Sequence, residues 1–180
     1  MEDKLLIWKL NCGRQDALCR IYEKYRDALV RIAAGLLNDT GAAEDIVQDV
    51  FLRLVSSANK YEVKKNLKAY LTTCVINKAR NFIRAKKPLS LISIDDAEPA
   101  ASNFESPDHG VICEEDFQNL YNAMAQLPYE QKEAVILHIQ AKMKFRQIAE
   151  LQQASIKTTM SRYNYGLNKL RSILNNEVLK

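Results

Sequence analysis

Apolar side chains recur every three or four residues along several long stretches of this sequence, and this spacing constrains the fold more than any other feature. Residues 15–37 carry them at the i, i+3, i+4 and i+7 positions that make one face of a helix apolar. The residues concerned are Leu18, Ile21, Tyr22, Tyr25, Leu29, Ile32, Ala33 and Leu36. Similar spacing predicts a helix over 42–55, preceded by cap candidates at residues 38–41, and a helix from Leu67 to about residue 83, with Asn66 as its N-cap. A short helix around Trp8 is expected before them. Because no long stretch alternates with period two, the sequence predicts an all-α fold.

The second half of the chain shows the same helical spacing. It predicts helices over 115–127, from Pro128 to about residue 139, over 145–151, and from an N-cap at Ser155 to about residue 174. The last two make a short helix, a tight turn and a longer helix, which is the pattern of a helix-turn-helix. Only five Gly and four Pro occur among 180 residues, and this scarcity of turn-forming residues agrees with long helices.

The net charge of +4 is distributed very unevenly along the chain. Residues 60–87 contain nine basic residues and one acid, whereas residues 88–115 contain seven acids, no Lys or Arg, and three of the four prolines. An acidic, proline-bearing segment without helical spacing is typical of a solvated linker. We therefore expect two small helical domains, 1–87 and 116–180, joined by an acidic flexible linker over 88–115, with the helix-turn-helix in the second domain.

Sequence motifs for catalysis and for metal binding are missing. There is no Gly-rich phosphate loop, no GxSxG and no HExxH. His138 lies in an apolar stretch and is expected to be a partly buried structural residue. Asp45 and Asp49 share one helix face, which we expect to be exposed to solvent or to contact a protein partner, and not to bind a metal. The four cysteines, Cys12, Cys19, Cys74 and Cys113, lack CxxC spacing, so we expect no zinc site. We expect their thiols to be reduced and buried. The sequence thus predicts no enzyme, no cofactor and no metal.

The chain also lacks the patterns of a membrane or exported protein. No apolar run reaches the roughly 18 residues of a membrane span. The N-terminus, Met-Glu-Asp-Lys, does not have the pattern of a signal peptide. We expect a cytoplasmic protein without direct membrane insertion.

Cations, aromatic rings and amides occur together in residues 60–87, a combination suited to nucleic acid. Cations contact phosphates, while aromatic rings and amides stack on or hydrogen-bond to exposed bases. A solubilising cationic face would explain the charge alone. In the second domain, cations and short polar groups occupy the predicted recognition helix, as in a helix that enters the major groove: Lys157, Thr158, Arg162, Asn164 and Lys169.

The first domain contains two notable strings, LNDTGAAEDIVQDVFLRL (37–54) and AYLTTCVINKARNFIRAKK (69–87). Both resemble bacterial RNA polymerase sigma factors of the small extracytoplasmic-function class. The first is similar to the family's helix that docks on the polymerase clamp helices, which implies polymerase-binding roles for Asp45, Gln48, Asp49 and Phe51. The second is similar to the family's helix that separates the strands and reads the −10 element. With the preceding loop, which corresponds to the family's pocket for a flipped-out base, it implies −10 contacts from Asn59, Lys60, Tyr61, Asn66, Tyr70, Asn77, Lys78, Asn81 and Arg84.

The second domain resembles the family's −35-reading unit. LPYEQKEAVIL (127–137) is similar to its opening helix and FRQIAELQQASIKTTMSRYNYGLNKLR (145–171) to its helix-turn-helix. Gln153 stands where the family usually has a turn glycine, so it either adopts a left-handed conformation at a cost of about 1 kcal/mol or the turn differs. Met160 replaces the usual Lys and removes one potential phosphate contact. The resemblance implies −35 contacts from Ser155, Lys157, Thr158, Ser161, Arg162 and Asn164.

The resemblance implies a transcription initiation factor. Such a protein binds core RNA polymerase, directs it to promoter DNA, and has an anti-sigma factor as a further potential partner. Two other functions remain open on the residues alone. One is a free-standing helix-turn-helix regulator, in which helix 42–55 would be an interface between copies. The other is a helical adaptor that has lost DNA binding, which Gln153 and Met160 would permit.

Overall fold

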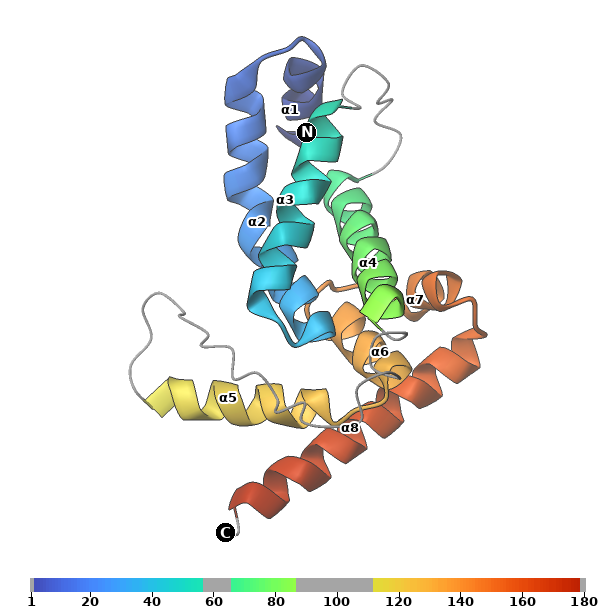
Figure 1. Cartoon of the computed structure of the whole chain (residues 1–180). Coiled ribbons are helices and arrows are strands. Elements are labelled where there is room, and N and C mark those ends of the chain that lie inside the picture. Colours follow the sequence, from blue (N-terminus) through green and yellow to red (C-terminus); the bar gives the residue numbers. More distant parts are fainter. Residues whose placement is uncertain (1, 57–65, 87–111, 179–180) are drawn as a thin grey trace. The chain divides into compact units, whose positions relative to one another are not determined.

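The computed structural model describes residues 2–56, 66–86 and 112–178, and every regular element in these ranges is a helix (Figure 1). The all-α prediction is therefore confirmed. Contacts divide the chain into two compact units, Met1–Ala101 (unit 1) and Ser102–Lys180 (unit 2). Of the predicted linker, only residues 112–115 are described, and they already belong to the first helix of unit 2.

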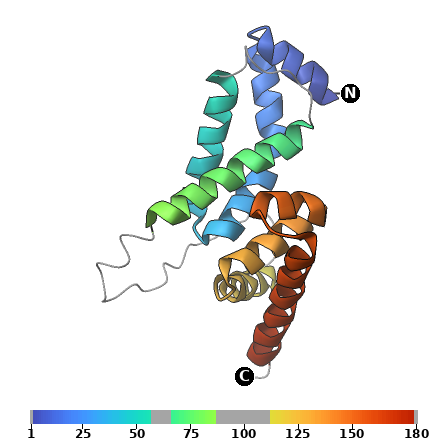
Figure 2. The same ribbon diagram turned by 90° about the vertical axis from the view of Figure 1, so that its right-hand side faces the viewer.

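Unit 1 is built around one long helix, α2 (Gln15–Leu37). It packs against α1 (Glu2–Asn11), α3 (Thr40–Ser56) and α4 (Leu67–Lys86), and α3 also packs on α4 (Figure 2). Burial of a Leu or Ile side chain in such a core contributes about 1.5–3 kcal/mol, so the shared apolar core holds the four helices together. Its largest fully buried side chains are Ile21, Leu29, Ile32, Leu36, Leu54, Leu67, Leu71 and Ile76.

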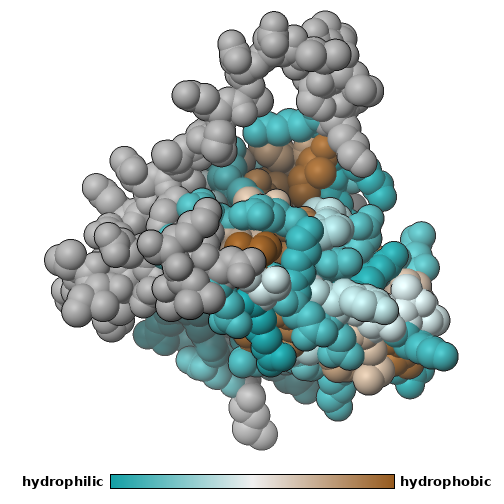
Figure 3. Space-filling view, turned by 90° about the horizontal axis from the view of Figure 1, so that it is seen from below, coloured by the Kyte–Doolittle hydropathy of each residue, from teal (hydrophilic) through white to brown (hydrophobic). Residues whose placement is uncertain are grey.

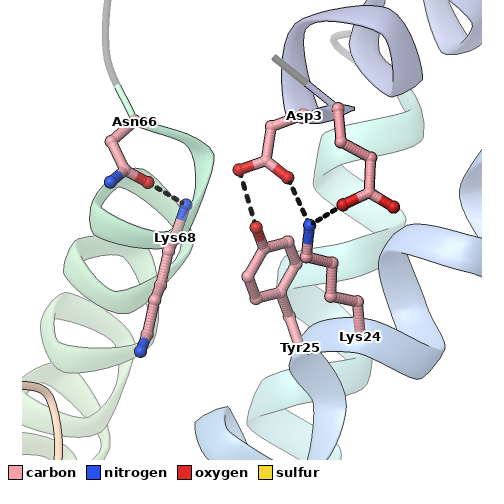
Figure 4. Close-up of polar contacts among 6 residues, drawn as sticks. Asp3, Lys24, Tyr25, Asn66 and Lys68 are labelled. Atoms are coloured by element: carbon pink, nitrogen blue, oxygen red, sulfur yellow. Dashed lines mark hydrogen bonds and ion pairs between the residues drawn. The ribbon is translucent and has the colours of Figure 1, made fainter.

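Short polar side chains set the helix ends in unit 1, as their positions in the sequence predicted. Asn38 adopts a left-handed conformation (φ 54°) and donates its backbone N–H to the Ala34 carbonyl at 2.8 Å, which ends α2. Asp39 Oδ1 accepts the backbone N–H of Ala42 at 2.9 Å in the first turn of α3. The predicted N-cap of α4 is confirmed, because Asn66 Oδ1 accepts the backbone N–H of Lys68 at 3.0 Å (Figure 4).

Helix α1 is tied to α2 by a small polar cluster in addition to its buried face. The Asp3 carboxylate accepts hydrogen bonds from the Tyr25 hydroxyl at 2.7 Å and from Lys24 Nζ at 2.8 Å (Figure 4). Lys24 also pairs with Glu2 at 2.6 Å. Burial, followed by the hydrogen bond to Asp3, raises the pKa of Tyr25 to about 12, so this hydroxyl stays a donor at neutral pH.

Unit 2 contains α5 (Ile112–Ala125), α6 (Tyr129–Ile139), α7 (Phe145–Gln152) and α8 (Ile156–Val178). Helix α8 packs against the other three. Its closest approach to α6 depends on Gly166, since a Cβ at that position would lie 2.9 Å from Val135 Cγ2. The predicted helix-turn-helix is present as α7 and α8, and α8 extends four residues past the predicted end at 174.

Two further expectations need correction. Pro128 is the N-cap of α6, with extended backbone (φ −53°, ψ 140°), and not a residue of its first turn. Cys12 and Cys19 are exposed and Cys74 is only partly buried, so the prediction of buried thiols was wrong for the first two. Cys12 follows the end of α1, and Cys19 lies off the apolar positions predicted for residues 15–37, so helical spacing already indicated that Cys19 is exposed.

The turn of the helix-turn-helix adopts the left-handed backbone that the family's glycine would favour, with Gln153 in its place. Gln153 has φ 50° and ψ 43°, and its backbone N–H points to the carbonyls of Ala149 and Glu150 at the end of α7. Helix α8 then begins with a side-chain cap, because Ser155 Oγ accepts the backbone N–H of Thr158 at 3.0 Å. The turn is therefore the expected one, and the chain accepts the strain of a side chain at a left-handed position.

We expect Gln153→Gly to stabilise unit 2, because it relieves left-handed strain of about 1 kcal/mol. Gln140 provides a matched control, since it ends α6 with ordinary helical backbone (φ −85°, ψ −46°). Gln140→Gly should lower the free energy of unfolding, because glycine there adds freedom to the unfolded chain. Urea unfolding followed by circular dichroism measures both. Equal effects of the two substitutions would contradict the prediction.

Helix α6 buries two charged residues side by side in sequence. Lys132 is 8% exposed and Glu133 is 1% exposed. Burial lowers the pKa of Lys132 to about 8, whereas an exposed lysine titrates near 10.4. The folded state therefore holds the lysine's proton less tightly than the unfolded state does. This burial costs stability in full below pH 8, and the cost disappears as the pH rises to about 10.4.

We expect Lys132→Met to raise the free energy of unfolding at pH 7 by on the order of 2 kcal/mol, and this gain should shrink between pH 8 and about 10.4. Lys169→Met removes an equal charge from an exposed position of α8 and is the control. Far-UV circular dichroism follows unfolding of both units, while fluorescence of Trp8, the only tryptophan, reports unit 1 separately. A gain from Lys132→Met that is constant from pH 7 to 10 would contradict the assigned cause.

Candidate protein and nucleic-acid interfaces

One outward face of α3 gathers most of the residues predicted to bind polymerase. Asp45, Gln48 and Asp49 are exposed on it. Phe51 is not: it is 5% exposed and its ring meets that of Tyr22 edge-on, with 4.9 Å between ring centroids. Phe51 is therefore a core residue that holds α3 on α2. The spacing explains this, since Phe51 lies four residues after Val47 and three before Leu54, on the apolar stripe.

The same face of α3 carries two large apolar side chains that the sequence argument missed. Leu52 is 65% exposed and Val55 is 43% exposed. They follow Asp45 and Gln48 at positions i, i+3, i+7 and i+10, so all four lie along one side of the helix. This side, with Asp49 at its edge, is called here the α3 face. The sequence could have indicated that Leu52 is exposed, because it lies seven residues, or two helical turns, after Asp45. It was missed because an apolar residue in a helix is usually assigned to the core.

An ion pair joins the α3 face to helix α4. Lys78 Nζ contacts Asp49 Oδ2, and this hydrogen bond, with the attraction of the ammonium charge, lowers the pKa of Asp49. Lys78 is thereby directed toward α3. The structure thus brings together one residue predicted to bind polymerase and one predicted to bind DNA, and the Lys78 ammonium already has a partner within unit 1.

Helix α4 presents a polar face opposite its buried stripe. Tyr70, Asn77, Asn81 and Arg84 recur at helical spacing on the side away from Leu71. Tyr70 is partly buried, and the other three are exposed. We call these four residues the α4 face. Asn66 starts the helix as its N-cap, so its side-chain oxygen is used within α4. The predicted −10 residues Asn59, Lys60 and Tyr61 lie outside the described residues.

Helix α8 exposes a polar face along its first three turns. Lys157, Thr158, Ser161 and Asn164 are exposed, and we call them the α8 face. Tyr165 also lies on it and is 67% exposed, although it is not among the predicted −35 contacts. Ser155 differs from the rest, because its hydroxyl caps the helix and lies 2.8 Å from the Thr158 hydroxyl.

Arg162 lies at the edge of the α8 face and belongs to a polar network that joins α6, α7 and α8. Its Nη1 donates to Gln152 Oε1 at 2.9 Å. Gln152 Nε2 donates to Glu133 Oε2 and to the Glu130 carbonyl, each at 3.0 Å. The Tyr129 hydroxyl donates to Glu133 Oε1 at 3.0 Å. We call these contacts the Gln152 network. No periodic pattern marks Gln152, so only the structure identifies it.

An aromatic cluster holds the start of α7 against α8. The His138 ring stacks on Phe145 with 4.3 Å between centroids and meets Tyr163 edge-on at 4.9 Å. His138 Nδ1 lies 2.9 Å from the Met143 carbonyl, so this nitrogen carries the proton and donates it. The prediction that His138 is a partly buried structural residue is confirmed.

The described surface offers polar faces more than pockets for a small ligand. Seen from below, it is mainly hydrophilic with small, separate hydrophobic areas (Figure 3). Among the described residues, no group of three or more His, Cys, Asp or Glu side chains could hold a metal ion. Within the same ranges, no helix is both long and apolar enough to cross a membrane. Exposed helix faces are therefore the candidate sites in the described parts of the chain.

Comparison with known proteins assigns each unit to a family region. Residues 21–88 match Sigma-70 region 2, and residues 117–170 match Sigma-70, region 4. The RNA polymerase sigma factor CarQ of Myxococcus xanthus is 26% identical over 90% of this chain and 91% of its own. The ECF RNA polymerase sigma factor SigW of Bacillus subtilis is 22% identical over 95% and 96%.

Solved structures show the same fold. The sigma factor RpoE of Bartonella quintana, in complex with the anti-sigma factor NepR, superimposes with a TM-score of 0.72 at 24% identity over 87% of this chain and 95% of that one. CnrH, in complex with the cytosolic domain of CnrY, superimposes with a TM-score of 0.66 at 18% identity over 98% and 99%.

A region 2 unit followed by a region 4 unit defines a transcription initiation factor. The chain belongs to the extracytoplasmic-function class of RNA polymerase sigma factors. It binds core RNA polymerase and directs it to promoter DNA. Members of this family act in transcription initiation and are not classical enzymes.

Proposed function

We propose that the three exposed helix faces divide the work of initiation between a first domain, 1–87, and a second domain, 116–180. The α3 face docks on polymerase, the α4 face reads melted −10 DNA, and the α8 face reads the −35 duplex. The observation that supports this best is the separation of each polar face from the buried stripe of its own helix. Residues 88–115 are proposed as the acidic linker between the domains.

The α3 face has the composition of a protein interface. Leu52 and Val55 supply apolar area toward the C-terminal end of α3, and Asp45, Gln48 and Asp49 supply polar groups in the turns before them. Buried apolar anchors within a polar rim supply most of the binding energy in such interfaces, while the charges set orientation and encounter rate. Phe51 contributes from beneath by fixing α3 on α2.

The α4 face has the groups needed to hold separated bases. Side-chain amides such as those of Asn77 and Asn81 can pair with an adenine edge through two hydrogen bonds, and the ring of Tyr70 can stack on a base. Arg84 can contact the phosphate backbone. Lys78 supports this face through its ion pair with Asp49, which joins α4 to α3. Asn59, Lys60, Tyr61 and Asn66 are proposed to hold the flipped-out base.

The α8 face has the groups of a helix that enters the major groove. Lys157 and Arg162 supply cations near its start, and Thr158, Ser161 and Asn164 supply short hydrogen-bonding groups. Ser155 is proposed to act through the cap that orders the first turn, since its hydroxyl already binds the Thr158 N–H. Met160 is 44% exposed beside this face and offers no phosphate contact.

Family membership also supports proposals on location and regulation. We propose that the protein acts in the cytoplasm, where promoter DNA and polymerase meet, and that it performs no catalysis of its own. An anti-sigma factor is proposed as a partner that occludes one or more of the three faces. Copurification of the tagged protein from its host, followed by mass spectrometry, tests for such a partner.

The docking proposal predicts that Leu52→Glu weakens binding to core polymerase about thirtyfold, because it places a charge at an apolar position that docking would desolvate. Leu5→Glu is the matched control, since Leu5 is 52% exposed on α1, outside the α3 face. Fluorescence anisotropy of labelled full-length protein titrated with core polymerase measures the affinity. Circular dichroism checks that both variants fold. Wild-type affinity for Leu52→Glu would contradict the proposal.

The −10 proposal predicts that Asn81→Ala reduces promoter opening about tenfold without weakening polymerase binding, because one base contact is lost. Asn119→Ala makes the same change on the exposed surface of α5. The promoter is first found by mapping transcript starts when the protein is overproduced. Permanganate footprinting of the reconstituted holoenzyme then measures strand opening. An equal loss in Asn119→Ala, or no loss in Asn81→Ala, would refute the assignment.

A further inference from the structure

The Gln152 network contains an amide whose orientation is fully determined by its neighbours. Gln152 Nε2 faces two acceptors, Glu133 Oε2 and the Glu130 carbonyl, so both of its N–H groups are used. Gln152 Oε1 faces Arg162 Nη1, which can only donate. Rotating the amide by half a turn would set acceptor against acceptor and donor against donor. The amide oxygen is therefore held in place toward Arg162.

The carboxylate behind this amide is itself fixed. Glu133 is 1% exposed, and its two oxygens accept hydrogen bonds from the Tyr129 hydroxyl and from Gln152. A buried carboxylate must keep such bonds, because leaving one of its oxygens unpaired is costly. The order of contacts thus runs from a buried charge on α6, through a neutral amide on α7, to the guanidinium at the edge of the α8 face.

Arg162 uses one side of its guanidinium for this contact. The group is planar and presents its N–H donors as a rigid fork, so fixing Nη1 also fixes the directions of the others. Because a free arginine side chain has many rotamers, holding it before DNA arrives reduces the entropy lost on binding. A prepositioned fork favours the base or phosphate that fits it over those that would need the side chain to move.

We propose that Gln152 is a positioning residue for −35 selectivity: it acts through Arg162 and does not touch DNA itself. The inference rests on the proposed role of Arg162 at the −35 element and adds the residue that sets its geometry. A merely structural glutamine would affect stability and all promoter contacts alike. A positioning glutamine affects the contacts of Arg162 alone.

The test is a double-substitution cycle read out as base preference. Holoenzyme reconstituted from core polymerase and the full-length protein transcribes a promoter library randomised across the −35 region. Sequencing of the transcribed templates gives the preference at each position. Arg162→Ala identifies the positions that depend on the guanidinium. Gln152→Met keeps the side-chain length and removes both its donors and its acceptor, and Gln140→Met makes the same change at the exposed end of α6.

We expect Gln152→Met to lower preference about tenfold at the positions that Arg162→Ala identifies, and to leave the other positions unchanged. In the Arg162→Ala background it should cause no further loss. Gln140→Met should match the wild type. The inference is overturned if Gln152→Met has no effect, if its loss spreads over all positions, or if the two losses add.

A swapped pair keeps the inference testable if Gln152→Met does not fold. In E133Q/Q152E, the amide at 133 can donate to the carboxylate at 152, which still accepts from Arg162, although the bond to the Glu130 carbonyl is lost. This pair should retain wild-type preference at the Arg162-dependent positions. A swapped pair that folds by circular dichroism but has lost this preference overturns the inference. An Arg162→Ala variant with unchanged preference would instead refute the proposed role of Arg162.

Discussion

Burial of one apolar stripe on each helix is the constraint on which the rest of this structure depends. In unit 1, the stripes of α1, α3 and α4 meet the long helix α2, and in unit 2 those of α5, α6 and α7 meet α8. In α3, α4 and α8, the stripe that turns inward leaves the opposite side of the helix exposed, whereas α6 is buried throughout residues 132–137. The α3, α4 and α8 faces exist because the apolar residues behind them have already determined how each helix is rotated.

Unit 2 departs from local conformational and burial preferences at three residues. Gln153 occupies a left-handed turn without the glycine that would adopt it at least cost. Lys132 and Glu133 are charged residues in a buried position on α6. The carboxylate of Glu133 is stabilised by hydrogen bonds from two other side chains, so its burial also orders the helix-turn-helix. Such buried polar networks give a site a defined geometry at the expense of some stability.

Much of the fold followed from the sequence, because helical periodicity is a local property. The ends of α2 and α7, the caps at Asn66 and Ser155, and the order of the helices were predicted to within a few residues. The family resemblance was confirmed by matches in both units, which sets aside the free-standing regulator and the adaptor. The errors concern Leu52, whose exposure was missed, and Cys12 and Cys19, which were expected in the core. Apolar residues and thiols are usually assigned to the core, and only tertiary contacts show which positions another helix covers.

The sequence by itself determined the class of the protein, the order of the helices in the described residues, and the sides of those helices that carry polar groups. Each of these features depends only on how residues are spaced within one segment of the chain. Only the tertiary structure decided which polar groups remain available and which already have partners, such as Lys78 with Asp49 and Arg162 with Gln152. Those partners come from residues 10 to 29 positions away in sequence, and helical periodicity has no information at that range.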